Sequence, residues 1–437
     1  MFKINVTDRF KNLHEQYFSK NIIARLRNKK ITFDSTDIIN LRDNYGINNI
    51  QAIHDDFIDY CINNANRISV GDYSELKKVN DEIESNYPLI IELINNKNFK
   101  FNSSNKMYWQ SLFDIFGYDD FCKCELYEVI LQIAMNYTNI LKLNKDKDKC
   151  IVEIQFITIL EKLFPGLKSQ IDNEFDEIIK GNVFKKDDFK IMFNEFADKY
   201  SLEFTINNYK NMNLYGVWNA YLFVYEIELR TCPYCNRQYI TPVLTSTGKM
   251  RATLDHFLPK NRYPYFSMSL YNLIPACYNC NSSLKGDNDF NTEDINPYEE
   301  SMDDYIEFFA DLRIDKQMKV NVIHKNIHKL REVDKYIGMF KLNEQYNYHA
   351  NQVEELVLKR YMYSDEYIKD IKEKILYKFN ISEKQIKEQI IGYTEDNMKI
   401  NDEPLSKFRR DMVNQLWFFD DYDLYLVNKL QDILDNK

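Results

Sequence analysis

CPYC at residues 232–235 and CYNC at residues 277–280 place four cysteines in two pairs, with two residues inside each pair. A turn of this kind points two thiolates toward one centre, and two such turns complete the tetrahedral shell of a Zn²⁺ ion. We therefore predict one structural zinc site, closed to a catalytic water, with the ligands Cys232, Cys235, Cys277 and Cys280. Cysteines that bind no metal in a reducing compartment are the alternative.

The segment between the cysteine pairs predicts an inserted structure, because its 41 residues exceed the usual spacing of a zinc ribbon. Two β-rich runs, at 239–245 and 249–254, flank Gly248 and predict a hairpin. Asp255 and His256 follow the second run directly, so two chemically active side chains stand at the end of a strand.

These side chains suit phosphodiester hydrolysis, which needs a nucleophilic water, a base that deprotonates it and a cation on the scissile phosphate. His256 has the ordinary pKa of a base that works near neutrality. Consecutive strand residues point to opposite faces, so Asp255 can share a hard cation with the side-chain oxygen of Asn281. Oxygen ligands with retained waters favour Mg²⁺, or Mn²⁺ in vitro.

Positive charge is concentrated around the same segment. The whole chain has 57 basic and 67 acidic residues, a net charge of −10, which by itself predicts no affinity for nucleic acid. Residues 230–290 nevertheless hold seven basic and three acidic residues, a local balance of +4. Lys285, with Arg262 or Lys260, is therefore expected to contact phosphates. The neighbouring aromatic residues could stack on bases, but we favour packing over the zinc lobe; they are Tyr263, Tyr265 and Phe266.

Both flanks of this segment predict helices. Only 10 glycines and 9 prolines occur in 437 residues, and residues 126–137 carry apolar side chains at helical spacing. The charged run at 145–149 is expected to be an exposed loop. No apolar run approaches the ~18 residues of a membrane helix, and the charged start holds no signal peptide, so we expect a cytoplasmic protein with no membrane partner.

The segment also resembles a known family. Asp255-His256, then Asn272, then Asn281 directly after Cys280 resemble the ββα-metal core of HNH endonucleases, in the subgroup with a four-cysteine zinc. LDHFLPK at 254–260 and the longer string to residue 300 are similar to the HNH subunits of Septu-type bacterial antiphage defence systems, which also occur with retrons. The resemblance implies that Asn272 pins the loop that orients His256 and that Asn281 replaces the last histidine of the motif.

The expected architecture is mainly α with a small zinc-stabilised ββα-metal (HNH) insert, α+β overall. The expected parts are a helical domain at 1–215, the nuclease core at 216–300 and a helical region at 301–437. The similarity is specific over about residues 230–300, and the first ~200 residues resemble no family that we can name.

The resemblance implies a metal-dependent endonuclease acting in antiphage defence, with DNA favoured over RNA as substrate. The chain has no P-loop motif and is acidic overall, which suits a cutting subunit controlled by a partner. The resemblance implies that this partner is an ATPase. Two alternatives stay open: a ribonuclease with the same core, for instance one that cuts tRNA, and a non-catalytic zinc-stabilised adaptor that binds nucleic acid.

Overall fold

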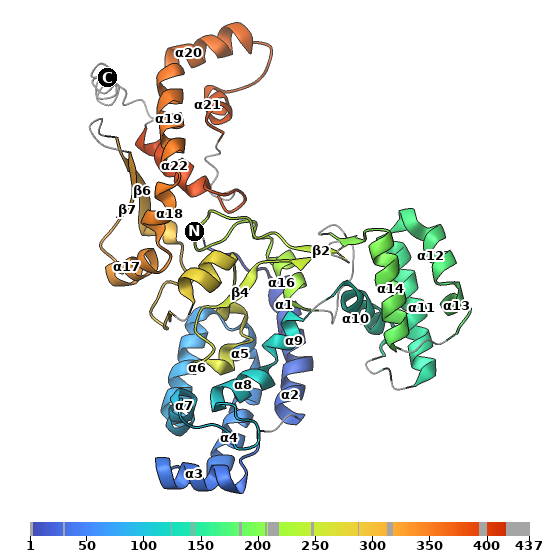
Figure 1. Ribbon diagram of the computed structural model, residues 1–437. Coiled ribbons are helices and arrows are strands. Elements are labelled where there is room, and N and C mark those ends of the chain that lie inside the picture. Colours follow the sequence, from blue (N-terminus) through green and yellow to red (C-terminus); the bar gives the residue numbers. More distant parts are fainter. Residues whose placement is uncertain are drawn as a thin grey trace.

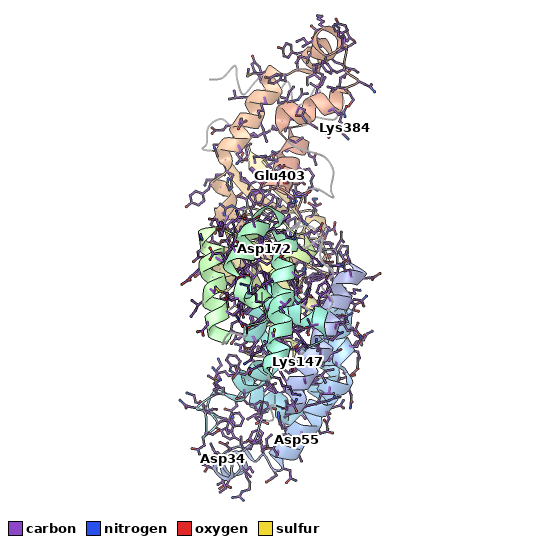
Figure 2. All side chains as sticks on the ribbon, turned by 90° about the vertical axis from the view of Figure 1, so that its right-hand side faces the viewer. Asp34, Asp55, Lys147, Asp172, Lys384 and Glu403 are labelled. Atoms are coloured by element: carbon purple, nitrogen blue, oxygen red, sulfur yellow. The ribbon has the colours of Figure 1, made fainter. Side chains whose placement is uncertain are left out.

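The computed structural model describes residues 3–28, 31–123, 125–140, 143, 145–182, 186–205, 208, 218–245, 249–286, 288–312, 318–392 and 400–416. The described part is mostly helical and contains three small antiparallel sheets, so the predicted α+β class is confirmed. Helical lobes surround a central region of short strands (Figure 1). The molecule is elongated, with Asp34 near one end and Lys384 near the other (Figure 2).

The first lobe is built from short amphipathic helices. They are α1 (Asp8–Tyr17), η1 (Phe18–Ile22), α2 (Ile23–Asn28), α3 (Ser35–Tyr45), α4 (Ile50–Asn63), α5 (Ala65–Val70), α6 (Tyr73–Asn86), α7 (Pro88–Asn95), α8 (Tyr108–Phe116) and α9 (Tyr118–Cys122). Thr7 caps α1 by accepting a hydrogen bond from the Phe10 amide. Gly117, with φ of +74°, makes the sharp turn from α8 to α9, and a Cβ there would lie 2.7 Å from Arg25 Nε.

A second helical lobe follows, drawn in green in Figure 1. It contains α10 (Leu126–Thr138), α11 (Asp146–Leu163), η2 (Pro165–Leu167), α12 (Lys168–Glu174), α13 (Asp176–Ile179) and α14 (Lys186–Lys199). The predicted apolar stripe of α10 is buried from Leu126 to Ala134, but its last member, Tyr137, is exposed. The loop expected at 145–149 is wrong, because all but its first residue form the start of α11, where Asp146 and Asp148 complement the helix dipole.

The central region contains the predicted strands. Its elements are β1 (Glu203–Phe204), α16 (Ala220–Ile227), β2 (Val243–Thr245), β3 (Lys249–Met250), β4 (Thr253–His256), η3 (Pro264–Phe266), η4 (Leu270–Asn272), β5 (Leu273–Ala276) and η5 (Asn279–Lys285). β2 pairs with β3 as predicted, although Gly248 lies outside the described residues. The second predicted run divides, since its end belongs to β4, which pairs antiparallel with β5 and brings Asp255 opposite Ile274.

The described part of the C-terminal lobe is helical except for one hairpin that the sequence did not predict. Its elements are η6 (Met302–Asp304), β6 (Ile306–Asp311), β7 (Lys319–His324), α17 (Leu330–Met339), α18 (Leu342–Asn347), α19 (Ala350–Met362), α20 (Asp365–Asp370), η7 (Ile371–Ile375), α21 (Glu383–Ile391) and α22 (Ser406–Gln415). β6 buries Ile306, Phe308 and Ala310, an alternation typical of a strand with one covered face.

One continuous set of buried apolar side chains runs through the first lobe, the second helical lobe, the central region and the C-terminal lobe. The helical lobes therefore share a core with the central strands. No helix among the described residues combines the length and apolar character needed to cross a membrane.

Candidate metal centre and active site

The four predicted zinc ligands lie together. The sulfur atoms of Cys232, Cys235, Cys277 and Cys280 are all within 4.8 Å of one another, and all four residues are buried. Cys235 Sγ lies 4.0 Å from Cys277 Sγ, and no disulfide joins the four cysteines. A tetrahedral zinc with Zn–S bonds of about 2.3 Å places its sulfurs about 3.8 Å apart. This four-cysteine group can hold a metal ion, and its donors suit zinc.

Backbone amides support negative charge on the sulfurs. The amides of Arg237 and Cys280 donate to Cys235 Sγ and Cys277 Sγ, each over 3.4 Å. The amide of Cys277 donates to Cys232 Sγ over 3.4 Å and so connects the two cysteine turns. Hydrogen bonds from the three other thiols hold the pKa of Cys277 well below its usual range, and the contacts among the same thiols raise the pKa values of Cys235 and Cys280. The backbone amides favour the thiolate form that a metal requires.

The C-terminal lobe holds the first cysteine turn from outside. The hydroxyl of Tyr346 in α18 donates to the carbonyl of Cys235 over 2.6 Å, and that of Tyr336 in α17 donates to the carbonyl of Tyr234 over 2.8 Å. Asn236, at φ of +49°, accepts a hydrogen bond from the Lys407 amide through its side-chain oxygen. The first cysteine turn is therefore anchored to helices more than 100 residues away in sequence.

Lys407 itself belongs to a buried charge network. Its ammonium lies 2.7 Å from Asp303 Oδ1 and 2.6 Å from Asp411 Oδ2, and Arg410 pairs with both carboxylates. Burial raises the pKa of Asp303, but Lys407 and Arg410 outweigh it and hold that pKa below its usual range. Because these charges compensate one another, α22 can pack tightly beside the first cysteine turn.

Asp255 lies at the end of β4 with both carboxylate oxygens engaged. Oδ1 lies 2.8 Å from the ammonium of Lys285, and Oδ2 accepts a hydrogen bond from the Tyr234 hydroxyl over 2.6 Å. The Lys285 ammonium also donates to the His256 carbonyl over 2.6 Å. Both charged side chains are 4% exposed, so this ion pair is a buried one. It ties η5 to the end of β4.

His256 is held in one orientation by a loop carbonyl. Its Nε2 lies 3.0 Å from the carbonyl oxygen of Ser267, which can only accept, so Nε2 carries the proton and Nδ1 keeps its lone pair. The imidazole packs against the rings of Tyr118 and Phe113, with centroids 4.4 and 5.8 Å away. Burial lowers the pKa of His256 from 6.5 to about 3, so the ring is neutral at physiological pH.

Asn272 fixes the loop on the other side of His256. Its side-chain oxygen accepts a hydrogen bond from the Leu258 amide over 2.6 Å, and its Nδ2 donates to the carbonyls of Leu258 and Phe266. Its own carbonyl accepts from the Phe257 amide. A fully buried asparagine thus closes the loop that runs from His256 back to β5.

The remaining predicted residues lie around this centre. Asn281 is half-buried on η5, one turn before Lys285. Lys260 and Arg262 are exposed; the Lys260 ammonium lies 4.8 Å from the centroid of the Phe113 ring, and Arg262 Nη1 lies 3.9 Å from Asp289. Lys285, by contrast, is buried and bonded to Asp255. Lys260 and Arg262 thus present exposed cations, whereas the Lys285 ammonium faces the protein.

The aromatic cluster is packed as predicted, but one of its members packs against the first helical lobe and not over the zinc lobe. Tyr263, Tyr265 and Phe266 are buried, which fits packing instead of base stacking, but Tyr265 contacts the first helical lobe. Its hydroxyl donates to Asn80 of α6 over 2.9 Å, and its ring lies edge-on to Phe57 of α4. The first lobe therefore covers the loop between β4 and β5.

Sequence reasoning missed Tyr234 and His14 as parts of the site. Tyr234 stands inside the first cysteine pair, and its hydroxyl reaches Asp255. His14 of α1 is 254 positions from the Met268 carbonyl that it contacts over 2.8 Å, and it accepts a hydrogen bond from Trp218 Nε1 over 3.1 Å. Nothing in the spacing of the sequence signals so distant a contact.

Because three histidines are buried, we expect the folded protein to lose stability in acid. Burial lowers the pKa values of His14 and His54 to about 4 and that of His256 to about 3, from an ordinary 6.5. Between pH 6.5 and 4 the unfolded chain therefore binds more protons than the folded one, and stability falls as pH falls. Each histidine contributes on the order of 3 kcal/mol across this window. Urea unfolding at pH 7.5 and 5 measures the loss in the free energy of unfolding. This loss is expected to be smaller in a His54→Leu variant, which has one buried histidine fewer.

Comparisons with known proteins give partial matches. Septu protein PtuB of Bacillus thuringiensis is 32% identical over 110 residues, which cover 24% of this chain and 40% of that protein. Protein ea31 of Escherichia phage lambda is 36% identical over 72 residues, which cover 14% of this chain and 24% of that protein. The chain thus spans less than half the length of either relative. No family model and no solved structure matches.

Proposed function

We propose that this protein is a metal-dependent endonuclease of the HNH type that hydrolyses nucleic-acid phosphodiester bonds, with DNA favoured over RNA. The observation that carries the proposal is the arrangement at the end of β4. A neutral His256 keeps its Nδ1 lone pair, beside a carboxylate, in a loop pinned by Asn272. β4, β5 and η5 follow one another in the ββα order of that nuclease core.

His256 would act as the general base in this proposal. Its Nε2–H donates to Ser267, so Nδ1 is the atom that takes the proton from a water. The rings of Tyr118 and Phe113 hold the imidazole plane and exclude solvent from it. Approach of an anionic phosphate raises the pKa of a nearby imidazole, which strengthens a base that burial has weakened.

Asp255 and Asn281 would hold Mg²⁺ or Mn²⁺. Carboxylate and amide oxygens are donors that these cations prefer, and Asp255 Oδ1 already binds a positive group, the Lys285 ammonium. The donor set therefore fits a hard cation, provided that Lys285 releases Oδ1. When bound, such a cation supplies Lewis-acid stabilisation of charge on the scissile phosphate. The four cysteines would hold a structural Zn²⁺, with no open position for chemistry.

The exposed cations beside the loop would position the substrate. Lys260 and Arg262 follow His256 by four and six residues, so phosphates held by them would lie close to the base. Lys285 would join them only after leaving Asp255. The partial similarity to the Septu protein PtuB supports a role in an antiphage defence system. The proposal also includes a partner ATPase and a cytoplasmic location.

The deciding experiment incubates the purified chain with supercoiled plasmid, and separately with total RNA including tRNA, in Mn²⁺ or in EDTA. Mn²⁺-dependent nicking of plasmid supports the proposal. Cleavage of RNA alone favours the ribonuclease alternative. Binding to either nucleic acid without cleavage, with a partner ATPase present as well as absent, favours the zinc-stabilised adaptor and contradicts the proposal.

Asn281 offers a clean test of the hard-cation site, because it carries no charge and lies only half-buried on η5. Asn281→Ala is expected to reduce Mn²⁺-dependent cleavage at least about 10- to 100-fold. Loss of a residue that only hydrogen-bonds to a metal ligand lowers activity by about this factor, and loss of a ligand itself should lower it at least as much. Elemental analysis should still find zinc, because thiolates and not oxygens hold it.

Asn279→Ala is the matched control, since it makes the same change on the same helix at an exposed position. It is expected to cleave like the wild type. Equal activity in the Asn281→Ala variant would show that Asn281 does not hold the catalytic cation.

A further inference from the structure

Four consecutive carbonyls of the loop before β5 are each held by a hydrogen bond. The carbonyl of Phe266 accepts from Asn272 Nδ2, and that of Ser269 accepts from the Asn272 amide. Between them, the carbonyl of Ser267 accepts from His256 and that of Met268 accepts from His14. The hydroxyls of both serines are buried and have no hydrogen-bond partner among the described residues. The imidazoles and Asn272, not the loop's own side chains, therefore hold these carbonyls.

The tautomer of His14 is set by its second neighbour. Trp218 Nε1–H can only donate, and it lies 3.1 Å from His14 Nδ1, so Nδ1 must carry a lone pair. The proton is then on Nε2, which donates to Met268 over 2.8 Å. His14 is fully buried, and Phe223 and Phe121 pack edge-on to its ring, so the imidazole cannot rotate freely.

We propose that His14, oriented by Trp218, is a positioning residue that fixes the Ser267 carbonyl and thereby the imidazole of His256. The inference rests on the proposed nuclease function for its catalytic consequence. The Ser267 and Met268 carbonyls belong to consecutive planar peptides that meet at the Met268 Cα, so with the Met268 carbonyl held by His14 the Ser267 carbonyl can turn only through the φ and ψ of Met268. Loss of the His14 bond lets that oxygen turn, and His256 loses the partner that keeps its Nδ1 directed toward the substrate.

This role explains why the first helix belongs to the site although it holds none of the predicted catalytic groups. α1 carries His14 to the loop, and the Ile4 amide just before it donates to the Pro297 carbonyl over 2.8 Å. The segment from Ile4 to His14 is thus attached to the chain both before β5, at Met268, and after η5, at Pro297. A displacement of about 1 Å at a reacting group can lower the rate about 100-fold. The His14–Met268 hydrogen bond is one peptide away from the Ser267 carbonyl that holds His256, so its loss can produce a displacement of this size.

The test compares four full-length variants. His14→Leu removes both hydrogen bonds, whereas His14→Gln keeps an acceptor for Trp218 and a donor for Met268. Trp218→Phe removes only the indole donor. His54→Leu is the matched control, because His54 is also a buried neutral histidine, bonded to the Tyr108 hydroxyl in the same lobe.

Plasmid nicking in Mn²⁺ gives kcat and KM, and ¹⁵N NMR of the histidine side chains reports the His256 Nε2–H bond. His14→Leu is expected to lower kcat about 10- to 100-fold with KM little changed, and to alter the His256 signal. Trp218→Phe should have a smaller effect in the same direction. His14→Gln should restore most of kcat, and His54→Leu should leave kcat and the His256 signal unchanged even if it lowers stability.

An unchanged His256 signal in folded His14→Leu would overturn the inference, as would equal losses in His14→Leu and His54→Leu. If the wild-type protein cleaves nothing, the proposed function fails. The NMR comparison then still decides whether His14 holds His256 in place, because it needs no turnover.

Discussion

Replacing His256 with glutamine is expected to reduce cleavage about 10²–10⁴-fold, the usual contribution of a general base. Glutamine can still donate a hydrogen bond to the Ser267 carbonyl, but it has no basic nitrogen to accept a proton from water. The expected loss is therefore in kcat, with nucleic-acid affinity and zinc content unchanged. Nicking kinetics, a filter-binding assay and elemental analysis measure the three quantities.

His324→Gln is the matched control, since His324 is an exposed histidine at the end of β7 that pairs with Asp334. It should cleave like the wild type. A His256→Gln protein that keeps near-full activity would contradict the HNH mechanism. One that loses zinc or unfolds would instead give His256 a structural role.

Removing the zinc site is expected to have the largest effect on stability. Structural zinc contributes about 10–16 kcal/mol to the folding of isolated zinc-finger peptides, so Cys277→Ser should strongly destabilise the region around β4 and β5. Because one continuous core joins this region to both flanking lobes, we expect their stability to fall as well. Elemental analysis should find one zinc per wild-type chain and less than one in the variant, and thermal unfolding should show a lower Tm.

Cys61→Ser provides the control for this prediction, because Cys61 is also fully buried but lies in α4, outside the four-cysteine group. It should keep its zinc and lose far less stability. A folded wild-type protein purified without chelator that contains no zinc would contradict the metal assignment.

Spacing and periodicity in the sequence determine the cysteine turns, one helix and the position of the candidate catalytic segment. The short spacing within each cysteine pair fixes the local turn, so the four sulfurs could be assigned to one centre without coordinates. Apolar residues at helical spacing predicted α10 because that pattern depends only on local geometry. The adjacency of Asp255 and His256 and the position of Asn281 after Cys280 were likewise sufficient to locate the candidate catalytic segment.

Predictions of secondary structure from the local sequence pattern were wrong where another local effect or a tertiary contact determined the structure. The alternating charges at 145–149 suggested a loop, but acidic residues are also favourable at a helix start. The hairpin of β6 and β7 was missed because each strand is short and one of them is mostly exposed. Its pairing depends on cover from α18 and α22, which lie later in the chain.

The contacts that hold the candidate site come from packing between distant parts of the chain. Packing of η5 against the end of β4 buries Lys285, so this expected phosphate contact is the partner of Asp255. The same packing brings His14 from the first helix to the Met268 carbonyl and Tyr346 from α18 to the Cys235 carbonyl. A hydrogen bond between residues more than 100 positions apart leaves no trace in spacing or composition, because it is set by how whole lobes pack and not by the neighbouring sequence.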